Sequence, residues 1–146
     1  MTAIAFHFGA PDKLDYACRL LRKAVASGAK VLVLAPDSLA IKLNADLWAL
    51  SATEFVPHCL GTAESVVKER SAVVLVSDIA QAPAQRQVLL NLGEAVPVQF
   101  DAFERLIEVV STDESDRNQA RVRWRDYTER GYPITRHDLT VRGNAA

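Results

Sequence analysis

The chain has 146 residues, of which 49% are hydrophobic and 24% are charged. This is the length and composition of one folded globular domain, which excludes intrinsic disorder and fibrous low-complexity sequence. Lys and Arg number 17 against 18 Asp and Glu, so the formal net charge is -1, whereas domains that hold nucleic acid through many phosphates are usually strongly basic. We expect a single domain over residues 1–146, with a frayed tail at about 143–146.

Cysteine usage and hydropathy indicate where the protein works. Cys18 and Cys59 are too few for a disulfide framework, and a reducing cytoplasm is the simplest setting. No apolar run approaches the roughly 20 residues of a membrane-spanning helix. The first eight residues lack the basic region that begins a secretory signal. We therefore expect a cytoplasmic protein that makes no membrane contact.

The first third of the chain alternates strands with helices. Residues 3–8 form an apolar strand that ends at a turn, and Asp12 is placed to cap the helix that follows and stops at Gly28. Residues 30–35 form a continuous apolar strand. A second helix begins near Pro36, with an apolar stripe at Leu39, Leu43, Leu47 and Leu50. This alternation is typical of an α/β protein with parallel strands.

Further strands are predicted at residues 72–77, 87–92 and 106–111. The link between the first two is shorter than the dozen or so residues of a parallel crossover, so we expect either a mixed sheet or a pair separated by another strand. Residues 51–69 are expected to be irregular. The predicted fold is a three-layer α/β/α arrangement with a mostly parallel or mixed central sheet.

The clearest predicted helix covers residues 113–130, and residues 132–146 after it are expected to form a tail. The helix begins with three acidic residues and continues with five arginines. Acidic groups in a first turn interact well with the helix dipole, so capping is the preferred role for Asp113 and Glu114 rather than catalysis.

The predicted fold class often binds nucleotides, so we searched for the glycine patterns that cradle phosphate. The six glycines form neither G-x-G-x-x-G nor G-x-x-x-x-G-K-[ST]. Gly9 precedes a helix N-terminus, which is a generic anion site, although a turn is the simpler interpretation. An enzyme that binds a nucleotide or phosphate near Gly9 remains the main alternative function.

Catalytic and metal-binding patterns are also missing. His58 and Cys59 are sequence neighbours whose side chains tend to point apart, and no second cluster accompanies them, so no metal site is predicted. Cys18 falls on the apolar stripe of the first helix, where it is expected to be a small buried hydrophobe. No nucleophile with a base and no G-x-S-x-G turn is evident. We predict no catalytic residues and no cofactor.

Two surface constellations remain. Trp48 ends the second helix and Phe55 follows in a loop, an arrangement that favours either a protein-binding anchor or two rings that seal the edge of the core. Arg117, Arg121 and Trp124 share one face of the last helix.

With Val110 on the strand before it, this helix face can hold the carboxylate and aromatic side chain of a peptide C-terminus. The alternative is a solvated arginine face, with Trp124 and Tyr127 turned into the core. A third interpretation, direct binding of single-stranded DNA, is disfavoured by the acidic balance of the chain.

Both constellations resemble the chi subunit family of bacterial DNA polymerase III. The matching text is Leu47-Trp48, a spacer and Phe55-Val56-Pro57-His58-x-Leu60, then Ala120-Arg121-x-Arg123-Trp124-x-x-Tyr127 and Gly131-Tyr132. The resemblance covers nearly the whole chain. Two departures are Asn44, where the family often carries Asp, and Trp124, where Tyr is common.

The resemblance implies a non-catalytic accessory subunit whose fold looks nucleotide-binding but has no nucleotide site. It also implies two protein partners: the psi subunit, which links chi to the clamp loader, and the C-terminal tail of single-stranded DNA-binding protein. DNA is then contacted only indirectly. By position, Trp48 and Phe55 match the psi-facing patch. The residues that match the tail pocket are Val110, Arg117, Arg121 and Trp124.

Overall fold

The computed structural model describes residues 2–49, 58–61, 71–81 and 87–140. Its helices are α1 (Lys13–Ala26), α2 (Asp37–Trp48) and α4 (Glu114–Glu129), with short 3-10 turns η2 (Ile79–Gln81) and η3 (Phe100–Ala102). Its strands are β1 (Ala3–Ala10), β2 (Val31–Leu34), β3 (His58–Leu60), β4 (Val73–Val76), β5 (Val88–Asn91), β6 (Arg105–Ser111) and β7 (Ile134–Asp138).

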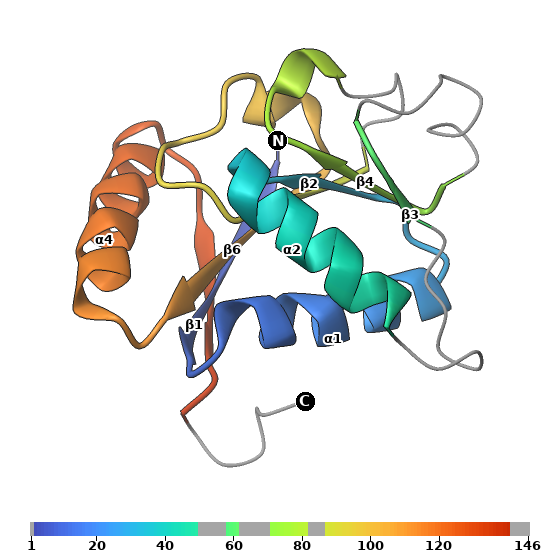
Figure 1. Cartoon of the computed structure of the whole chain (residues 1–146). Coiled ribbons are helices and arrows are strands. Elements are labelled where there is room, and N and C mark those ends of the chain that lie inside the picture. Colours follow the sequence, from blue (N-terminus) through green and yellow to red (C-terminus); the bar gives the residue numbers. More distant parts are fainter. Residues whose placement is uncertain (1, 50–57, 62–70, 82–86, 141–146) are drawn as a thin grey trace.

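The strands form one seven-stranded sheet in the order β3-β4-β2-β5-β6-β1-β7, and each pairs in parallel with its neighbours. α1 and α2 pack on one face and α4 packs on the other, so the predicted three-layer α/β/α fold is confirmed (Figure 1). No helix among the described residues is both long enough and apolar enough to cross a membrane.

The central strands are apolar on both sides because helices or turns cover both faces of the sheet. In β2, Val31 and Val33 belong to the core beneath α1 and α2, whereas Leu32 belongs to the core beneath α4. This alternation follows from the two-residue period of a strand. Because both faces of β2, β4 and β5 are buried, consecutive residues are apolar, and these strands are recognisable in the sequence as continuous apolar runs.

Side-chain caps fix where α1 and α4 begin, as the sequence predicts. Asp12 accepts a hydrogen bond from the Asp15 N–H, and Asp113 accepts one from the Asp116 N–H. After each helix a glycine adopts positive φ, Gly28 at 88° and Gly131 at 89°, a conformation that suits a helix end.

The structure corrects the sequence analysis in three places. β2 lies between β4 and β5, so the separated pair is the right alternative and the mixed sheet is wrong. β3 lies within the segment expected to be irregular, and β7 lies within the expected tail. β7 was missed because it is an edge strand whose mostly exposed, polar residues show no apolar alternation.

Candidate functional site

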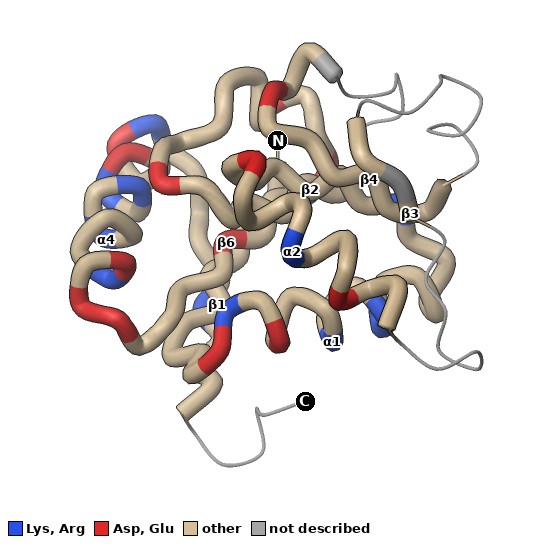
Figure 2. The backbone as a smooth tube through the Cα atoms, viewed as in Figure 1, with Lys and Arg blue, Asp and Glu red and all other residues tan. Residues whose placement is uncertain are grey.

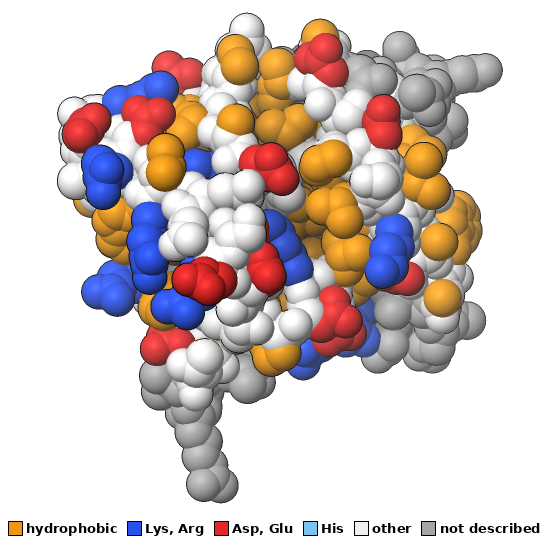
Figure 3. Space-filling model, turned by 60° about the vertical axis from the view of Figure 1, so that its left-hand side comes forward, with side chains coloured by type: hydrophobic (Ala, Val, Ile, Leu, Met, Phe, Trp, Pro, Cys, Tyr) orange, Lys and Arg blue, Asp and Glu red, His pale blue; other side chains and the backbone are white. Residues whose placement is uncertain are grey.

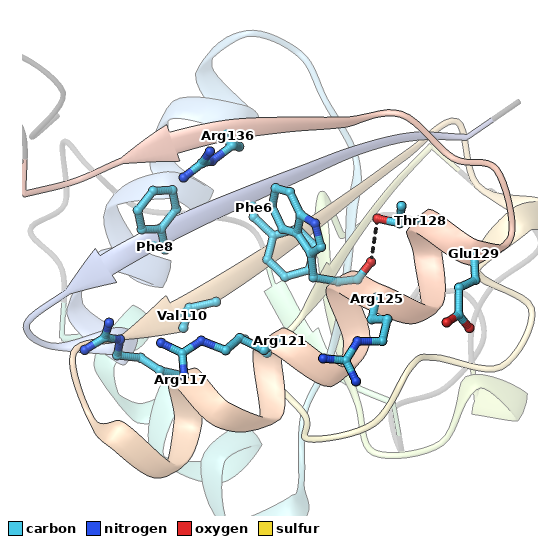
Figure 4. Close-up of a pocket in the computed structure, with 11 residues that line it drawn as sticks. Phe6, Phe8, Val110, Arg117, Arg121, Arg125, Thr128, Glu129 and Arg136 are labelled. Atoms are coloured by element: carbon cyan, nitrogen blue, oxygen red, sulfur yellow. Dashed lines mark hydrogen bonds between the residues drawn. The ribbon is translucent and has the colours of Figure 1, made fainter.

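A groove of about 660 Å³ lies between α4 and the edge of the sheet formed by β1 and β7 (Figure 4). Its floor is apolar. Phe6 and Phe8 are alternate residues of β1 and therefore face α4 together, and Val110 joins them from β6. Trp124 of α4 packs on this floor, with its ring centroid 4.9 Å from that of Phe6. The groove offers an aromatic and aliphatic surface to a ligand.

Arginines line both long sides of the groove. Arg117, Arg121 and Arg125 come from successive turns of α4, since residues four apart lie on one helix face. Arg136 comes from β7 on the opposite side, and its guanidinium carbon lies 5.6 Å from the Phe8 ring centroid and 5.8 Å from that of Trp124. Figure 3 shows Lys and Arg side chains interspersed with Asp and Glu on the side of the molecule formed by α4.

Among the described residues, these four arginines form no ion pair with a carboxylate. Arg121 donates instead to the amide oxygen of Asn118 at 3.0 Å. Glu129 is the acidic member of the lining, on the last turn of α4. A groove with an apolar floor and unneutralised guanidinium groups suits a ligand that joins an apolar group to carboxylates.

The structure brings together all four residues assigned to the tail pocket from sequence, since each lines this groove: Val110, Arg117, Arg121 and Trp124. Tyr127 is turned into the core as the solvated-face alternative expects, whereas Trp124 is half-buried, packing against the same core and also lining the groove. Sequence reasoning missed Arg125 and Arg136. Helical spacing from Arg121 could have found Arg125, whereas Arg136 required knowledge that β7 pairs with β1.

A buried polar network behind the groove fixes α4 on the sheet. Arg123 is 1% exposed, and its Nε donates to Oε1 of Glu108, which is 0% exposed, at 3.1 Å. The Tyr127 hydroxyl donates to the other carboxylate oxygen at 2.6 Å. Asn91 donates to Glu108 from β5, and Arg123 also donates to the Glu94 carbonyl at 2.9 Å. The network thereby sets which face of α4 lines the groove.

Burial governs the protonation of this network. Desolvation raises the pKa of Glu108, an effect that the Arg123 guanidinium and the Tyr127 hydroxyl oppose. Desolvation together with the Glu108 carboxylate raises the pKa of Tyr127, which keeps its phenol protonated as a donor. Removing one partner would leave a charged group buried without compensation.

The second predicted patch is described only in part. Trp48, the last residue of α2, is 59% exposed, and its ring centroid lies 4.8 Å from that of His58 on β3. Trp48 therefore does not seal the core. Ile41 lies seven residues earlier on the same helix and is 62% exposed, which extends the apolar surface along α2. Phe55 lies outside the described residues.

The alternative function, binding of a nucleotide or phosphate, predicts a ligand elsewhere. It would lie in the crevice between the neighbouring strands β1 and β6, which lead to helices on opposite faces of the sheet. Parallel α/β proteins commonly bind ligands at such a point. Here acidic residues stand at the starts of α1 and α4 (Figure 2). Asp116 pairs with Lys13 at 3.1 Å and accepts the Ser111 N–H at 2.8 Å.

Carboxylates therefore lie at this crevice, and Asp116 is held there by Lys13 and the Ser111 N–H. Burial acts to raise the pKa of Asp116, but the Ser111 N–H and Lys13 outweigh burial and lower it. A phosphate at this point would meet ionised Asp side chains in place of free N–H groups. An anion site is therefore not supported here, and the turn predicted at Gly9 is wrong, because Gly9 lies inside β1 at a register shift between Phe8 and Ala10, with φ at 82°.

The environment of Cys18 disfavours its thiolate form. Cys18 is buried as predicted, and burial together with Asp46 raises the pKa of its thiol to about 11. A protonated thiol is a poor nucleophile and a poor metal ligand. Among the described residues no three His, Cys, Asp or Glu side chains are grouped so that they could hold a metal ion.

The fold and the groove together define a three-layer parallel α/β protein whose candidate ligand site lies between α4 and the edge of the sheet formed by β1 and β7. A family model described as "DNA polymerase III chi subunit, HolC" matches residues 1–135. The chain belongs to the DNA polymerase III chi subunit family, as the resemblance of its motifs implies. It is thus a chi-type subunit of the polymerase III complex and takes part in DNA replication.

Three relatives, each named DNA polymerase III subunit chi, illustrate the similarity. The protein of Pseudomonas aeruginosa is 31% identical over 129 residues, which cover 87% of each chain. Those of Haemophilus influenzae and Escherichia coli are 26% identical over 127 residues and 27% identical over 118 residues. These alignments cover 86% of each chain in the first case, and 80% of this chain and 79% of the relative in the second.

Proposed function

We propose that this protein is a non-catalytic adaptor that joins two proteins during replication in the cytoplasm. One surface, the α4/β7 groove, binds the C-terminal tail of single-stranded DNA-binding protein. A separate surface around Trp48 and Phe55 binds the psi subunit and, through it, the clamp loader. DNA is reached only through the tail-bearing protein.

One observation carries the proposal for the groove: four arginines surround an aromatic floor, and no described carboxylate pairs with them. The family resemblance implies a tail that is disordered, acidic and ends in an aromatic residue. Such a tail supplies the ring that the floor can bury and the negative charge that the arginines need.

The binding mode follows from the positions of the lining residues. The terminal ring enters beside Val110 and Trp124, and the terminal carboxylate pairs with Arg121, assisted by Arg117. A hydrogen bond to a charged group contributes about 1.5–3 kcal/mol. Affinity is therefore expected to be micromolar. Several tails presented together by one DNA-coating protein would strengthen the attachment through multivalency.

The proposal for the psi surface depends on exposed apolar area on α2. Trp48 is 59% exposed and Ile41 on the same helix is 62% exposed. Two large exposed apolar side chains on one helix form an apolar patch that is unusual for a helix facing only solvent. Trp is also the residue type most enriched among interface anchors. This surface lies on the opposite side of the sheet from the groove (Figure 1), so both partners can bind at once.

The test of the groove is calorimetry with a synthetic tail peptide whose C-terminus is either free or amidated. The free-acid peptide should bind with micromolar affinity. Amidation removes the charge that Arg121 pairs with and should weaken binding about tenfold or more. Equal affinity for the two peptides would contradict the assignment of the groove to a chain terminus.

The test of the second surface is co-purification with psi. W48A and F55A should each lower the yield of the complex, because both remove apolar area at the interface. Tail binding by these variants should stay unchanged. R121A is the matched control, since it should lose the tail and keep psi. A normal yield of psi complex from both aromatic variants would contradict this surface.

A further inference from the structure

Polar side chains hold α4 on the sheet, unlike α2 on the other face. α4 buries three side chains, of which Arg123 and Tyr127 are polar and both donate to Glu108 of β6. The side chains that α2 buries are apolar: Ala40, Leu43 and Leu47. We propose that Glu108 is a positioning residue for the groove, so that tail binding depends on the alignment that this buried carboxylate imposes on α4. This inference rests on the proposed function of the groove.

Glu108 lies in the same row of the sheet as the groove. Strand pairing aligns one residue from each of four neighbouring strands: Asn91, Glu108, Phe6 and Arg136. Residues in register on parallel strands point to the same face of a sheet, here the face that α4 covers. Phe6 belongs to the groove floor and Arg136 to its far side (Figure 4). A helix that is bonded to Glu108 is therefore aligned with both.

Consecutive residues of α4 connect this bond to the ligand surface. Arg123 Nε donates to Glu108 Oε1 at 3.1 Å, and the next residue, Trp124, packs on Phe6 with ring centroids 4.9 Å apart. One residue of an α-helix corresponds to a rotation of about 100°, so a partial rotation of α4 would move Trp124 and Arg121 relative to the floor. Apolar contacts resist such a rotation less than hydrogen bonds do, because the hydrophobic effect is not directional.

The network also holds α4 from the side opposite the groove. Arg123 Nη1 donates to the Glu94 carbonyl at 2.9 Å. Asn91 donates to Glu108 at 3.0 Å and to the Ala95 carbonyl at 3.2 Å. β5 and the loop after it lie across β6 from β1 and β7. These bonds therefore fix the helix without occupying the surface that a ligand needs.

Position and stability can be separated in a buried network of this kind. Glu108 and Arg123 are 0% and 1% exposed, so both charges have lost their hydration. Their mutual attraction offsets that cost, and replacing a buried pair with apolar side chains of similar volume is often neutral or stabilising. The apolar replacement lacks the fixed geometry of the hydrogen bonds. A variant can therefore keep the fold and lose the arrangement of the groove.

The experiment replaces the network as a unit in E108L/R123M/Y127F and measures thermal unfolding and calorimetric affinity for the free-acid tail peptide. The melting temperature should stay within about 5 °C of wild type or rise. Affinity should fall about fivefold or more, because the lining side chains are no longer preorganised. L43V, in the core beneath α2, is the control for stability alone. Its affinity for the peptide should stay within about twofold of wild type at any melting temperature.

If circular dichroism shows the triple variant to be unfolded, Y127F replaces it. Y127F keeps the Arg123–Glu108 pair and removes one hydrogen bond to the carboxylate, and its affinity should fall about two- to fourfold. Unchanged affinity in the folded variant that is measured overturns the inference, as does an equal loss in L43V. Failure of the proposed function gives a different result, because wild type itself would then bind free-acid and amidated peptides equally.

Discussion

Two arginines of α4 that are two residues apart have opposite environments. Arg123 is 1% exposed and hydrogen-bonded to Glu108, whereas Arg121 is exposed and, among the described side chains, donates a hydrogen bond only to the Asn118 amide. Each arginine lies between two apolar residues in the sequence. Only the position of the sheet beneath the helix distinguishes their environments. The comparison teaches that an arginine-rich helix can hold structural cations on one face and ligand-binding cations on the other.

The largest expected effect is on the free energy of unfolding, and it distinguishes the buried face of α4 from its exposed face. R123M leaves Glu108 buried without its cation, so the free energy of unfolding should fall by about 3–5 kcal/mol. R121M removes an exposed side chain and should change it by less than about 0.5 kcal/mol. Urea unfolding of both variants checks this. Similar losses in the two variants would break the comparison.

A pH titration tests the same strand pair, β1 and β7, from the face opposite the groove, where His7 contacts Tyr16 of α1. His7 of β1 stacks on His137 of β7, the residue after Arg136, with ring centroids 4.4 Å apart. Burial, with smaller contributions from His137 and Arg105, lowers the pKa of His7 to about 4. An unfolded histidine titrates near 6.5, so between these values the unfolded chain binds more protons and stability falls as pH falls.

The expected loss from His7 between pH 6.5 and 4 is about 1–3 kcal/mol, less than the full shift implies because the ring is partly exposed. H7Q should show a flatter dependence of unfolding free energy on pH over the same window. The difference between the two curves isolates His7 from the carboxylates that titrate nearby. Parallel curves would show that folding does not lower the pKa of His7.

The smallest expected effect concerns salt. Exposed groove arginines are screened by ions, so raising NaCl from about 50 to 300 mM should weaken tail-peptide binding about three- to tenfold. The buried Arg123–Glu108 pair is shielded from ions, and the unfolding free energy should change by less than about 1 kcal/mol. Calorimetry and urea unfolding in the same buffers measure both. Salt-independent binding would contradict an electrostatic groove.

The sequence predicts most of the layered fold because its signals are local. Apolar runs mark β2, β4 and β5, and Asp12 and Asp113 mark the starts of two helices. β7 was missed because its signal is not local. Its polar residues form a strand only because the β1 edge offers hydrogen-bond partners more than a hundred residues earlier.

The candidate site divides in the same way. Helical spacing and family resemblance identify the α4 residues, and Val110 follows from the strand before them. Placing Arg136 at the groove requires knowing that β7 pairs with β1. Recognising that Arg123 is buried requires knowing that it pairs with Glu108, an acid in an apolar strand whose partner cannot be found from sequence spacing. Long-range pairing therefore limits what the pattern of residues can predict.

The most direct test of the account compares R121A with wild type in two measurements on the same samples, calorimetric titration with the free-acid tail peptide and urea unfolding. The account predicts that binding weakens about tenfold or more while the free energy of unfolding stays within about 0.5 kcal/mol of wild type. Full affinity in R121A, or a stability loss as large as that of R123M, would contradict it.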